Sequence, residues 1–163
     1  MLMITQRLQE ARRTDVCLEL PFEARCRSRL RATLSNGEAV AIVVARGQVL
    51  RGGDLLLAED GRVIEICAAA ELVSTAHGKD AAELIRAAYH LGNRHVALQI
   101  SSGWLRYNHD HVLDDMVRGL GLSVSVEQAP FEPEVGAYAP HETASHQAGH
   151  AHGPGGVARD PFP

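Results

Sequence analysis

The stretch that decides the fold is residues 80–126, which read DAAELIRAAYHLGNRHVALQISSGWLRYNHDHVLDDMVRGLGLSVSV. Asp80 can cap a helix together with Glu83, and apolar residues then recur at helical spacing until Gly92 supplies a stop. We therefore expect an amphipathic helix with an inward face made of Ala81, Leu84, Ile85, Ala88 and Leu91.

The rest of this stretch alternates between strand and helix periods. The elements expected are strands at 96–100 and 104–107, a helix from Asn108 or Asp110 to Gly121 with Val112, Leu113, Met116, Val117 and Leu120 inward, and a strand at 122–126. If residues 71–75 supply an opening strand, the order is strand, helix, strand, strand, helix, strand. That order predicts a ferredoxin-like βαββαβ domain.

The first half of the chain has the period of strands. Residues 16–20 and 29–34 alternate apolar with polar side chains, and Asn36-Gly37 favours a tight hairpin to a strand at 39–44. Glycine-rich turns separate two further strands, at 54–57 and 63–67. These patterns predict a small β domain.

The predicted architecture is therefore α+β, with two domains and a tail. We assign residues 1–72 to the β domain, as a partner- or peptide-binding unit, and residues 73–138 to the ferredoxin-like domain. Residues 139–163 are rich in glycine, proline and polar residues, so they are expected to form a disordered, histidine-containing tail.

Composition excludes several classes of partner. The net charge is −4 and the basic residues show no overall excess, so nucleic acid is not expected as a partner. The longest apolar run, 39–45, is far shorter than the roughly 20 residues that cross a bilayer. Charged residues at 7–13 interrupt any export signal. We therefore expect a cytoplasmic protein without a membrane partner, whose three cysteines are reduced thiols.

One basic stripe stands apart from this composition. Arg25, Arg27, Arg29 and Arg31 are spaced by two, which on a strand would put all four guanidinium groups on one face. Such a face could dock an acidic partner or a phosphate backbone. It could equally be the solvated face of a half-buried strand.

Histidine is the residue type that points to function. The chain has nine histidines and three cysteines, with no Cys-x-x-Cys pair. Imidazole is a common ligand for transition metals, so this balance indicates exchangeable metal binding rather than a thiolate cage. His95 follows the helix stop at Gly92 and precedes a strand, so its ring is expected at the rim of the fold.

His109 and His111 form a second candidate site. Residues two apart point to the same side of an extended chain, so both rings can bind one ion ahead of the helix, whereas on a helix they would diverge. In the alternative interpretation Asn108 or Asp110 is only a helix cap, and Asp114 and Asp115 form a solvated face. A third group, in the tail, includes His146, His150 and His152, which can collect metal from a flexible segment.

These residues also carry a family resemblance that spans nearly the whole chain. The motifs are LRGGD at 50–54, HLGNRHV at 90–96, HDHVLDDM at 109–116 and PFEPE at 130–134. Together they resemble UreE, the family of urease accessory nickel metallochaperones.

The resemblance implies a non-catalytic carrier that delivers Ni(II) to the urease maturation complex, which includes a GTPase and the urease apoprotein. It implies a homodimer in which His95 of each subunit holds one metal across the two-fold axis. It also assigns a secondary site to His109 and His111 and further ligands to His146, His150 and His152. Many members end in dense histidine runs, and the sparser tail here argues against storage of many ions.

Two imidazoles leave the nickel shell incomplete, so open positions remain through which an acceptor can take the ion. Zn(II) or Cu(II) is expected to substitute in vitro, because imidazole sites follow the usual affinity order. The alternative function is general binding or storage of divalent zinc or copper. A metal-dependent hydrolase is disfavoured, since no His-x-x-x-His helix or carboxylate cluster is present. Binding should weaken below about pH 6.5, where free imidazole gains its proton.

Overall fold

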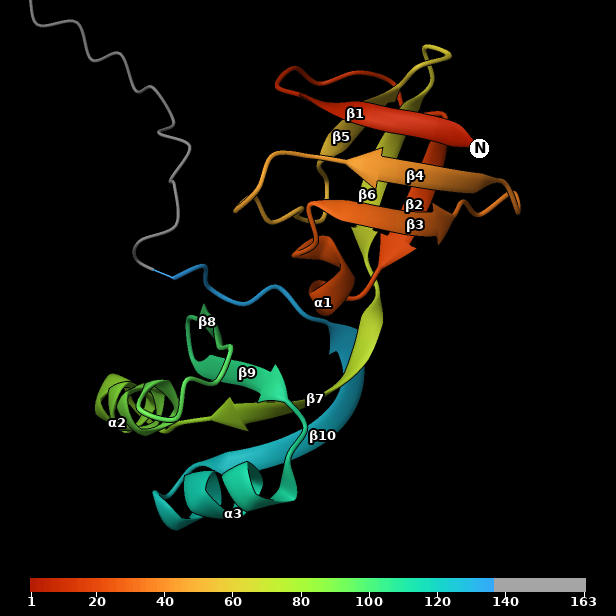
Figure 1. The fold of residues 1–163 in the computed structure, drawn as a ribbon. Helices are drawn as coiled ribbons and strands as arrows, with labels where there is room; N and C mark the ends of the chain where they lie inside the picture. The colour runs from red at the N-terminus through yellow and green to blue at the C-terminus, as the bar shows by residue number, and fades with distance from the viewer. Residues whose placement is uncertain (137–163) are drawn as a thin grey trace, which may run out of the picture.

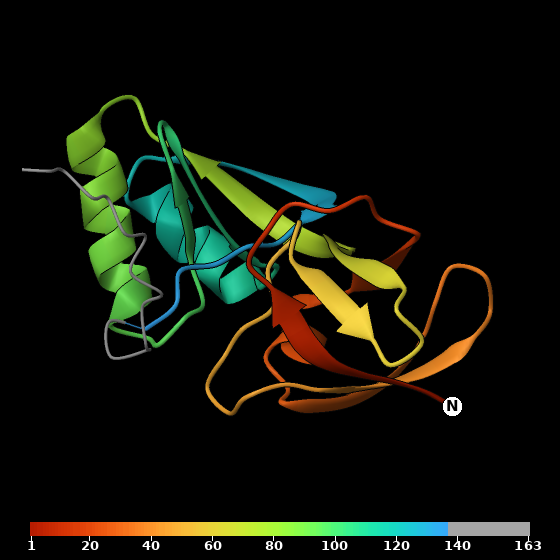
Figure 2. The same ribbon diagram turned by 90° about the horizontal axis from the view of Figure 1, so that it is seen from above.

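A computed structural model describes residues 1–136 of the chain. Figure 1 shows two bodies, an N-terminal sheet of strands and a C-terminal sheet with two helices, and Figure 2 shows both helices on one side of the second sheet. The α+β architecture predicted from the sequence is confirmed. The tail expected at 139–163 lies outside the described residues.

The N-terminal body is a six-stranded sheet in the order β2-β6-β5-β1-β4-β3. Its elements are β1 (Leu2–Leu8), β2 (Val16–Leu20), α1 (Phe22–Arg25), β3 (Arg29–Thr33), β4 (Ala39–Val43), β5 (Leu55–Ala58) and β6 (Val63–Ala68). The hairpin predicted at Asn36-Gly37 is confirmed, because β3 and β4 pair antiparallel from Arg29 with Val43 to Thr33 with Ala39. Strand β1 and helix α1 were not predicted.

Alternation explains why these segments form a sheet with one buried face. Ile4, Val40, Ile42, Leu56 and Ile64 are at most 1% exposed and belong to one apolar cluster. Burying a side chain of this size contributes about 1.5–3 kcal/mol. The first body therefore has its own core.

The C-terminal body is a four-stranded antiparallel sheet in the order β10-β7-β9-β8. Its elements are β7 (Ala70–His77), α2 (Ala81–Gly92), β8 (Gln99–Ser101), β9 (Trp104–Asn108), α3 (His111–Gly119) and β10 (Ser123–Pro130). This is the predicted ferredoxin-like order of strands and helices. Ala69 alone separates β6 from β7, and the boundary set at residue 72 remains a prediction.

The inward faces of the two helices were predicted only in part. Ala87 and Leu91 of α2 and Val117 of α3 are fully buried. Ile85 is 69% exposed, Val112 is 62% exposed and Ala81 is also exposed, so these three assignments were wrong. Each lies at the edge of its apolar stripe, where a small rotation of the helix turns the side chain to solvent.

The arginine stripe does not exist as a four-residue face. Arg25 ends the short helix α1 and is fully buried, and Arg27 pairs with Glu23 on the surface at 2.5 Å. Only Arg29 and Arg31 lie on β3, where both are exposed. The spacing of two did not predict a common face, because α1 begins directly after Pro21 and Arg25 therefore lies in a helix rather than in a strand.

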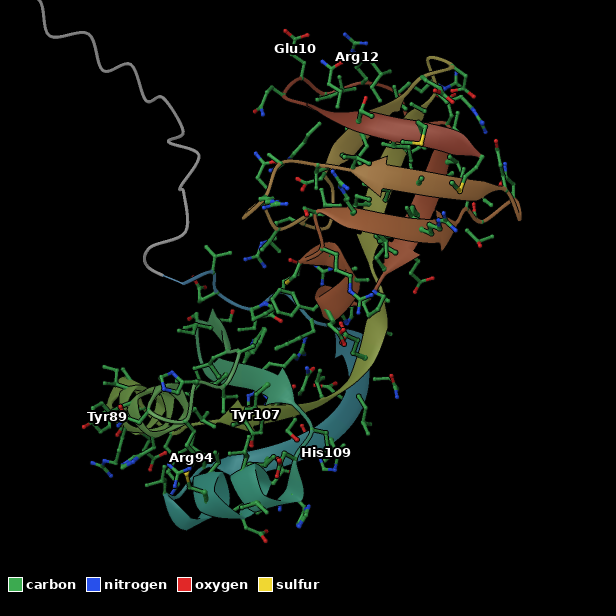
Figure 3. The ribbon with its side chains drawn as sticks, viewed as in Figure 1. Glu10, Arg12, Tyr89, Arg94, Tyr107 and His109 are labelled. Carbon is green, nitrogen blue, oxygen red and sulfur yellow. A yellow bond between two sulfur atoms is a disulfide. The ribbon has the colours of Figure 1, made fainter. Side chains whose placement is uncertain are left out.

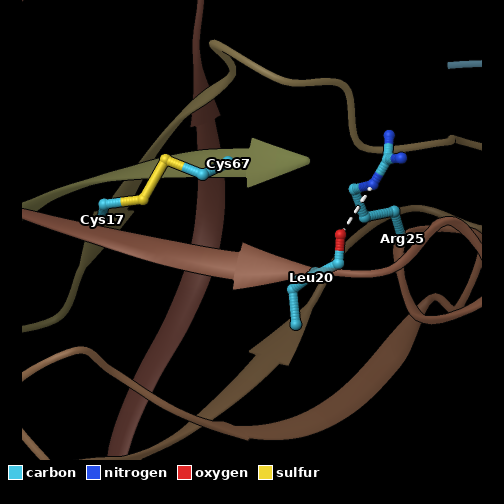
Figure 4. Close-up of a disulfide and its surroundings, with 4 residues drawn as sticks. All are labelled: Cys17, Leu20, Arg25 and Cys67. Carbon is cyan, nitrogen blue, oxygen red and sulfur yellow. Dashed lines mark hydrogen bonds between the residues drawn. A yellow bond between two sulfur atoms is a disulfide. The ribbon is translucent and has the colours of Figure 1, made fainter. Parts of the chain in front are cut away.

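The expectation that all three cysteines are free thiols was also wrong. Cys17 on β2 and Cys67 on β6 form a disulfide, with Cα atoms 6.2 Å apart (Figure 4). These strands pair in parallel, which brings together two residues separated by 50 positions in the sequence. Cys26 is a free cysteine and is exposed.

The two bodies are joined a second time after β10. Phe131 is fully buried, and its ring contacts Phe22 of α1 edge-to-face with centroids 5.7 Å apart. Val73 and Ala129 complete this small cluster. No helix within residues 1–136 has the length and apolar character needed to cross a membrane.

Candidate metal site

His95 lies three residues after Gly92, the last residue of α2, in the turn that closes the helix. Its backbone N–H donates to the carbonyl of Gly92 at 2.9 Å, and the next N–H, of Val96, donates to the carbonyl of Leu91 at 3.3 Å. This pair of bonds is the Schellman pattern that ends many helices. The predicted position of His95 at the rim of the fold is confirmed, since the residue is exposed.

The backbone of His95 is left-handed, with φ of 55°. It is the only non-glycine residue within 1–136 that has a positive φ. Glycine usually occupies this position of the Schellman pattern, because a Cβ atom costs about 1–2 kcal/mol in the left-handed region. The turn thus holds a histidine where glycine would be more stable, and such positions are typical of functional sites.

The chain that leads to the tail returns to the segment after His95. The backbone N–H of Glu132 donates to the side-chain oxygen of Gln99 at 3.0 Å. The N–H of Glu134 donates to the carbonyl of Leu98 at 2.8 Å. The last described residues are therefore fixed beside the strand that begins a few positions beyond His95.

His109 follows β9 and is held by polar groups of the C-terminal body. Figure 3 labels His109 and Tyr107 where β9 leads into α3. The Nδ1 atom of His109 lies 3.0 Å from the hydroxyl of Ser74 on β7 and 3.2 Å from Oδ2 of Asp114 on α3. The imidazole is 31% exposed. One edge of the ring is therefore bound to the protein while part of it still reaches solvent.

The carboxylate that holds His109 is itself buried and bonded. Asp114 is 1% exposed, and its Oδ1 accepts a hydrogen bond from the hydroxyl of Tyr107 at 2.9 Å. Burial and this bond to Asp114 raise the pKa of Tyr107, so the phenol stays protonated and continues to donate. Arg118 adds a positive charge 3.9 Å from Oδ2 of Asp114.

His111 occupies a different environment. It is the first residue of α3 and is exposed, without a side-chain partner among residues 1–136. The helix cap expected at Asp110 is confirmed, because its carboxylate accepts from the backbone N–H groups of Val112 at 2.8 Å and Leu113 at 3.3 Å. The cap does not decide whether His109 and His111 share an ion, and that pairing stays a prediction.

Within residues 1–136, no group of three or more His, Cys, Asp or Glu side chains is placed to hold a metal ion. The predicted ligands His95, His109 and His111 therefore belong to incomplete sets in a single described chain. His146, His150 and His152 lie outside the described residues.

Asp114, Ser74 and Tyr107 are site residues that the sequence reasoning missed. The alternative interpretation placed Asp114 on a solvated face with Asp115, and for Asp114 that alternative is wrong, since the residue is buried. A signal was present: Asp114 lies three positions before Val117, on the inward side of α3. Asp115, its neighbour, is the solvated carboxylate and contacts Arg118 at 3.3 Å.

Both bodies match models of known protein domains. Residues 4–69 match the model of the UreE urease accessory protein N-terminal domain, and residues 71–155 match that of its C-terminal domain. The protein named urease accessory protein UreE in Alkalilimnicola ehrlichii is 59% identical over 138 residues, which cover 85% of each chain.

Two further proteins with the same name are similar. The Pseudomonas putida W619 protein is 54% identical over 144 residues, which cover 86% of this chain and 89% of that one. The Citrobacter koseri protein is 49% identical over 153 residues, which cover 93% of this chain and 100% of that one.

Proposed function

The chain belongs to the UreE family of urease accessory proteins, which are not enzymes, and from this membership we propose that it is a nickel metallochaperone. In this proposal it binds Ni(II) in the cytoplasm and passes it to the urease apoprotein through a maturation complex that includes a GTPase. The observation that carries the proposal is His95, an exposed imidazole held in a left-handed turn.

We propose that the primary site is shared between two copies of the chain. A homodimer would place His95 of each copy on one ion, and an exposed ring at the end of a helix is free to meet such a partner. Two imidazoles leave positions open on Ni(II), so the ion can be released to an acceptor. The incomplete ligand sets of the single chain are compatible with this arrangement.

The tail would supply further ligands to the same ion. Glu134 is fixed beside Leu98, and His146 follows 12 residues later, which is a span of up to about 40 Å for an extended chain. His146, His150 and His152 can therefore reach a metal at His95. His109 and His111 would form the secondary site at the start of α3.

Calorimetry with NiCl₂ on full-length variants tests the primary site. We expect His95→Ala to lose the tight binding step while its thermal unfolding stays cooperative, because the ring is exposed. His77→Ala, which removes another exposed histidine, is the matched control and should bind as the native protein does. Unchanged stoichiometry and affinity in His95→Ala would refute the site. Sedimentation with and without nickel measures whether the carrier is a dimer.

Delivery is a separate measurement from binding. Nickel-loaded protein is mixed with urease apoprotein and its accessory proteins in the presence of a chelator, and urease activity is followed. The native protein should activate urease, whereas His95→Ala should not. If bound nickel is retained and urease stays inactive, general storage of divalent metal becomes the better function.

A further inference from the structure

We propose that Asp114 is a positioning residue, which fixes the ring of His109 so that its Nε2 atom faces outward as the metal-binding nitrogen. The inference deepens the proposed function, on which it rests, by naming the group that prepares one ligand of the secondary site. Its evidence is the contact between Asp114 and His109 and the set of bonds behind it.

The neighbours of Nδ1 determine the tautomer of His109. Oδ2 of Asp114 lies 3.2 Å from Nδ1 of His109, where the negative charge of an ionised carboxylate repels a lone pair and favours an N–H group. The hydroxyl of Ser74, 3.0 Å from the same Nδ1, can accept that proton. We therefore place the imidazole proton on Nδ1. A neutral imidazole has one such proton. The lone pair then lies on Nε2, which has no hydrogen-bond partner among residues 1–136.

The groups around the ring of His109 are held rigidly. Asp114 cannot turn away easily, because it is 1% exposed and its other oxygen accepts from Tyr107 at 2.9 Å. The hydroxyl of Ser74, on β7, lies 3.0 Å from the same Nδ1 and limits rotation of the ring. The four side chains come from β7, β9, the turn after β9, and α3, so the whole C-terminal body sets the direction of the ring.

The carboxylate also changes how well His109 binds a metal ion. A carboxylate that accepts from one nitrogen of a metal-binding histidine orients the ring and makes the other nitrogen a better donor. Loss of such a partner typically costs about 10–100-fold in metal affinity. His111 has no equivalent partner in the described part of the chain, so the two histidines differ: only His109 is prepared before the ion arrives.

Asp114→Asn is the informative substitution. Its amide oxygen can keep the bond from Tyr107, while its NH₂ group faces Nδ1 of His109 and donates to it. The proton of the imidazole then moves to Nε2, which blocks the metal-binding nitrogen. The matched control is Asp115→Asn, which removes the adjacent carboxylate and the same charge but leaves Asp114 in place.

The primary readout needs no metal. Nitrogen-15 NMR of full-length protein at pH 8 distinguishes the two tautomers of His109 by the shifts of its ring nitrogens. We expect the Nδ1–H form in the native protein and in Asp115→Asn, and the Nε2–H form in Asp114→Asn. An Nε2–H ring in the native protein overturns the proposal. If Asp114→Asn does not fold, Tyr107→Phe replaces it, with a mixture of tautomers expected and an unchanged ring counting against the proposal.

The second readout is nickel affinity at the step that His109→Ala abolishes. Asp114→Asn should weaken this step about 10–100-fold, whereas Asp115→Asn should leave it within about twofold. Equal affinities in the two variants overturn the positioning role. Failure of the proposed function looks different, since urease would then stay inactive with nickel-loaded native protein while the tautomer of His109 still depended on Asp114.

Discussion

The guanidinium of Arg25, fully buried at the end of α1, binds the carboxylate of Glu132 at 2.7 Å across 107 positions of sequence. Arg25 also donates to the carbonyls of Leu20, shown in Figure 4, Leu50 and Phe131. Glu132 in turn accepts from Arg51 and from the backbone of Gly52. This joint connects the N-terminal sheet to the segment that precedes the tail.

The first prediction is that Arg25→Ala destabilises the protein strongly. It leaves three carbonyls without the guanidinium donor and removes one donor from Glu132, which keeps its bonds from Arg51 and Gly52. Loss of such a buried charged partner typically costs about 3–5 kcal/mol. Urea unfolding at pH 7 measures this free energy. Arg27→Ala removes an exposed pair with Glu23 and should cost less than about 1 kcal/mol. Similar costs for the two variants would contradict the importance of the joint.

The second prediction is that the contribution of Glu132 to stability is lost at acid pH. Burial alone would raise the pKa of Glu132, but the N–H of Gly52 and the guanidiniums of Arg51 and Arg25 outweigh it and lower this pKa. A lowered pKa means that the carboxylate stabilises the fold above the unfolded-chain value of about 4.3, and that this contribution is lost as pH falls through the folded value.

Urea unfolding of native protein and Glu132→Gln between pH 7 and pH 3 tests this. The native protein should be more stable at pH 7, and the difference should shrink below about pH 4.3. Glu134→Gln, which removes an exposed carboxylate nearby, should follow the native curve. A difference between native and Glu132→Gln that stays constant to pH 3 would show that the charge of Glu132 does not stabilise the joint.

The third prediction is a thiol count. With Cys17 and Cys67 joined, one thiol per chain, that of Cys26, should react with Ellman's reagent in denaturant without reductant. Three should react after reduction. Three reactive thiols in unreduced protein purified with oxygen present would contradict the disulfide.

The strand and helix order of the C-terminal body could be predicted because local signals were strong. Asp80 caps α2 through the N–H of Glu83, and Asp110 caps α3, as their spacing indicated. The buried joint could not be predicted in this way. Arg25 and Glu132 come into contact only when the chain folds back after β10. No local sequence pattern around either residue therefore predicts the pair.

The candidate site, like the fold, was predicted only in part. Its histidines were identified by residue type and motif, whereas the buried position of Asp114 was not predicted, because an acidic residue on a helix is usually solvated. The left-handed backbone of His95 could not be predicted from the sequence either, because glycine is the residue that usually indicates this conformation. Tertiary contacts and backbone conformation, rather than composition, define how these side chains are presented.

The last prediction separates the backbone of His95 from its ring. His95→Gly and His95→Ala both remove the imidazole, so both should lose the tight nickel-binding step to the same extent. Their stabilities should differ, because glycine adopts the left-handed conformation freely while alanine pays about 1–2 kcal/mol. The extra freedom of glycine in the unfolded chain offsets about 0.4–1 kcal/mol of this.

We therefore expect His95→Gly to unfold at a higher urea concentration than His95→Ala, by a free energy of about 1 kcal/mol. His90→Gly and His90→Ala are the matched control pair, since residue 90 lies within α2. There the order should reverse, because glycine inside a helix is less stable than alanine by about 1 kcal/mol. If alanine is more stable than glycine at both positions, the turn is not left-handed in solution. If the turn is left-handed, histidine at position 95 makes the fold less stable than glycine would. Its presence there is then explained by the function of its ring.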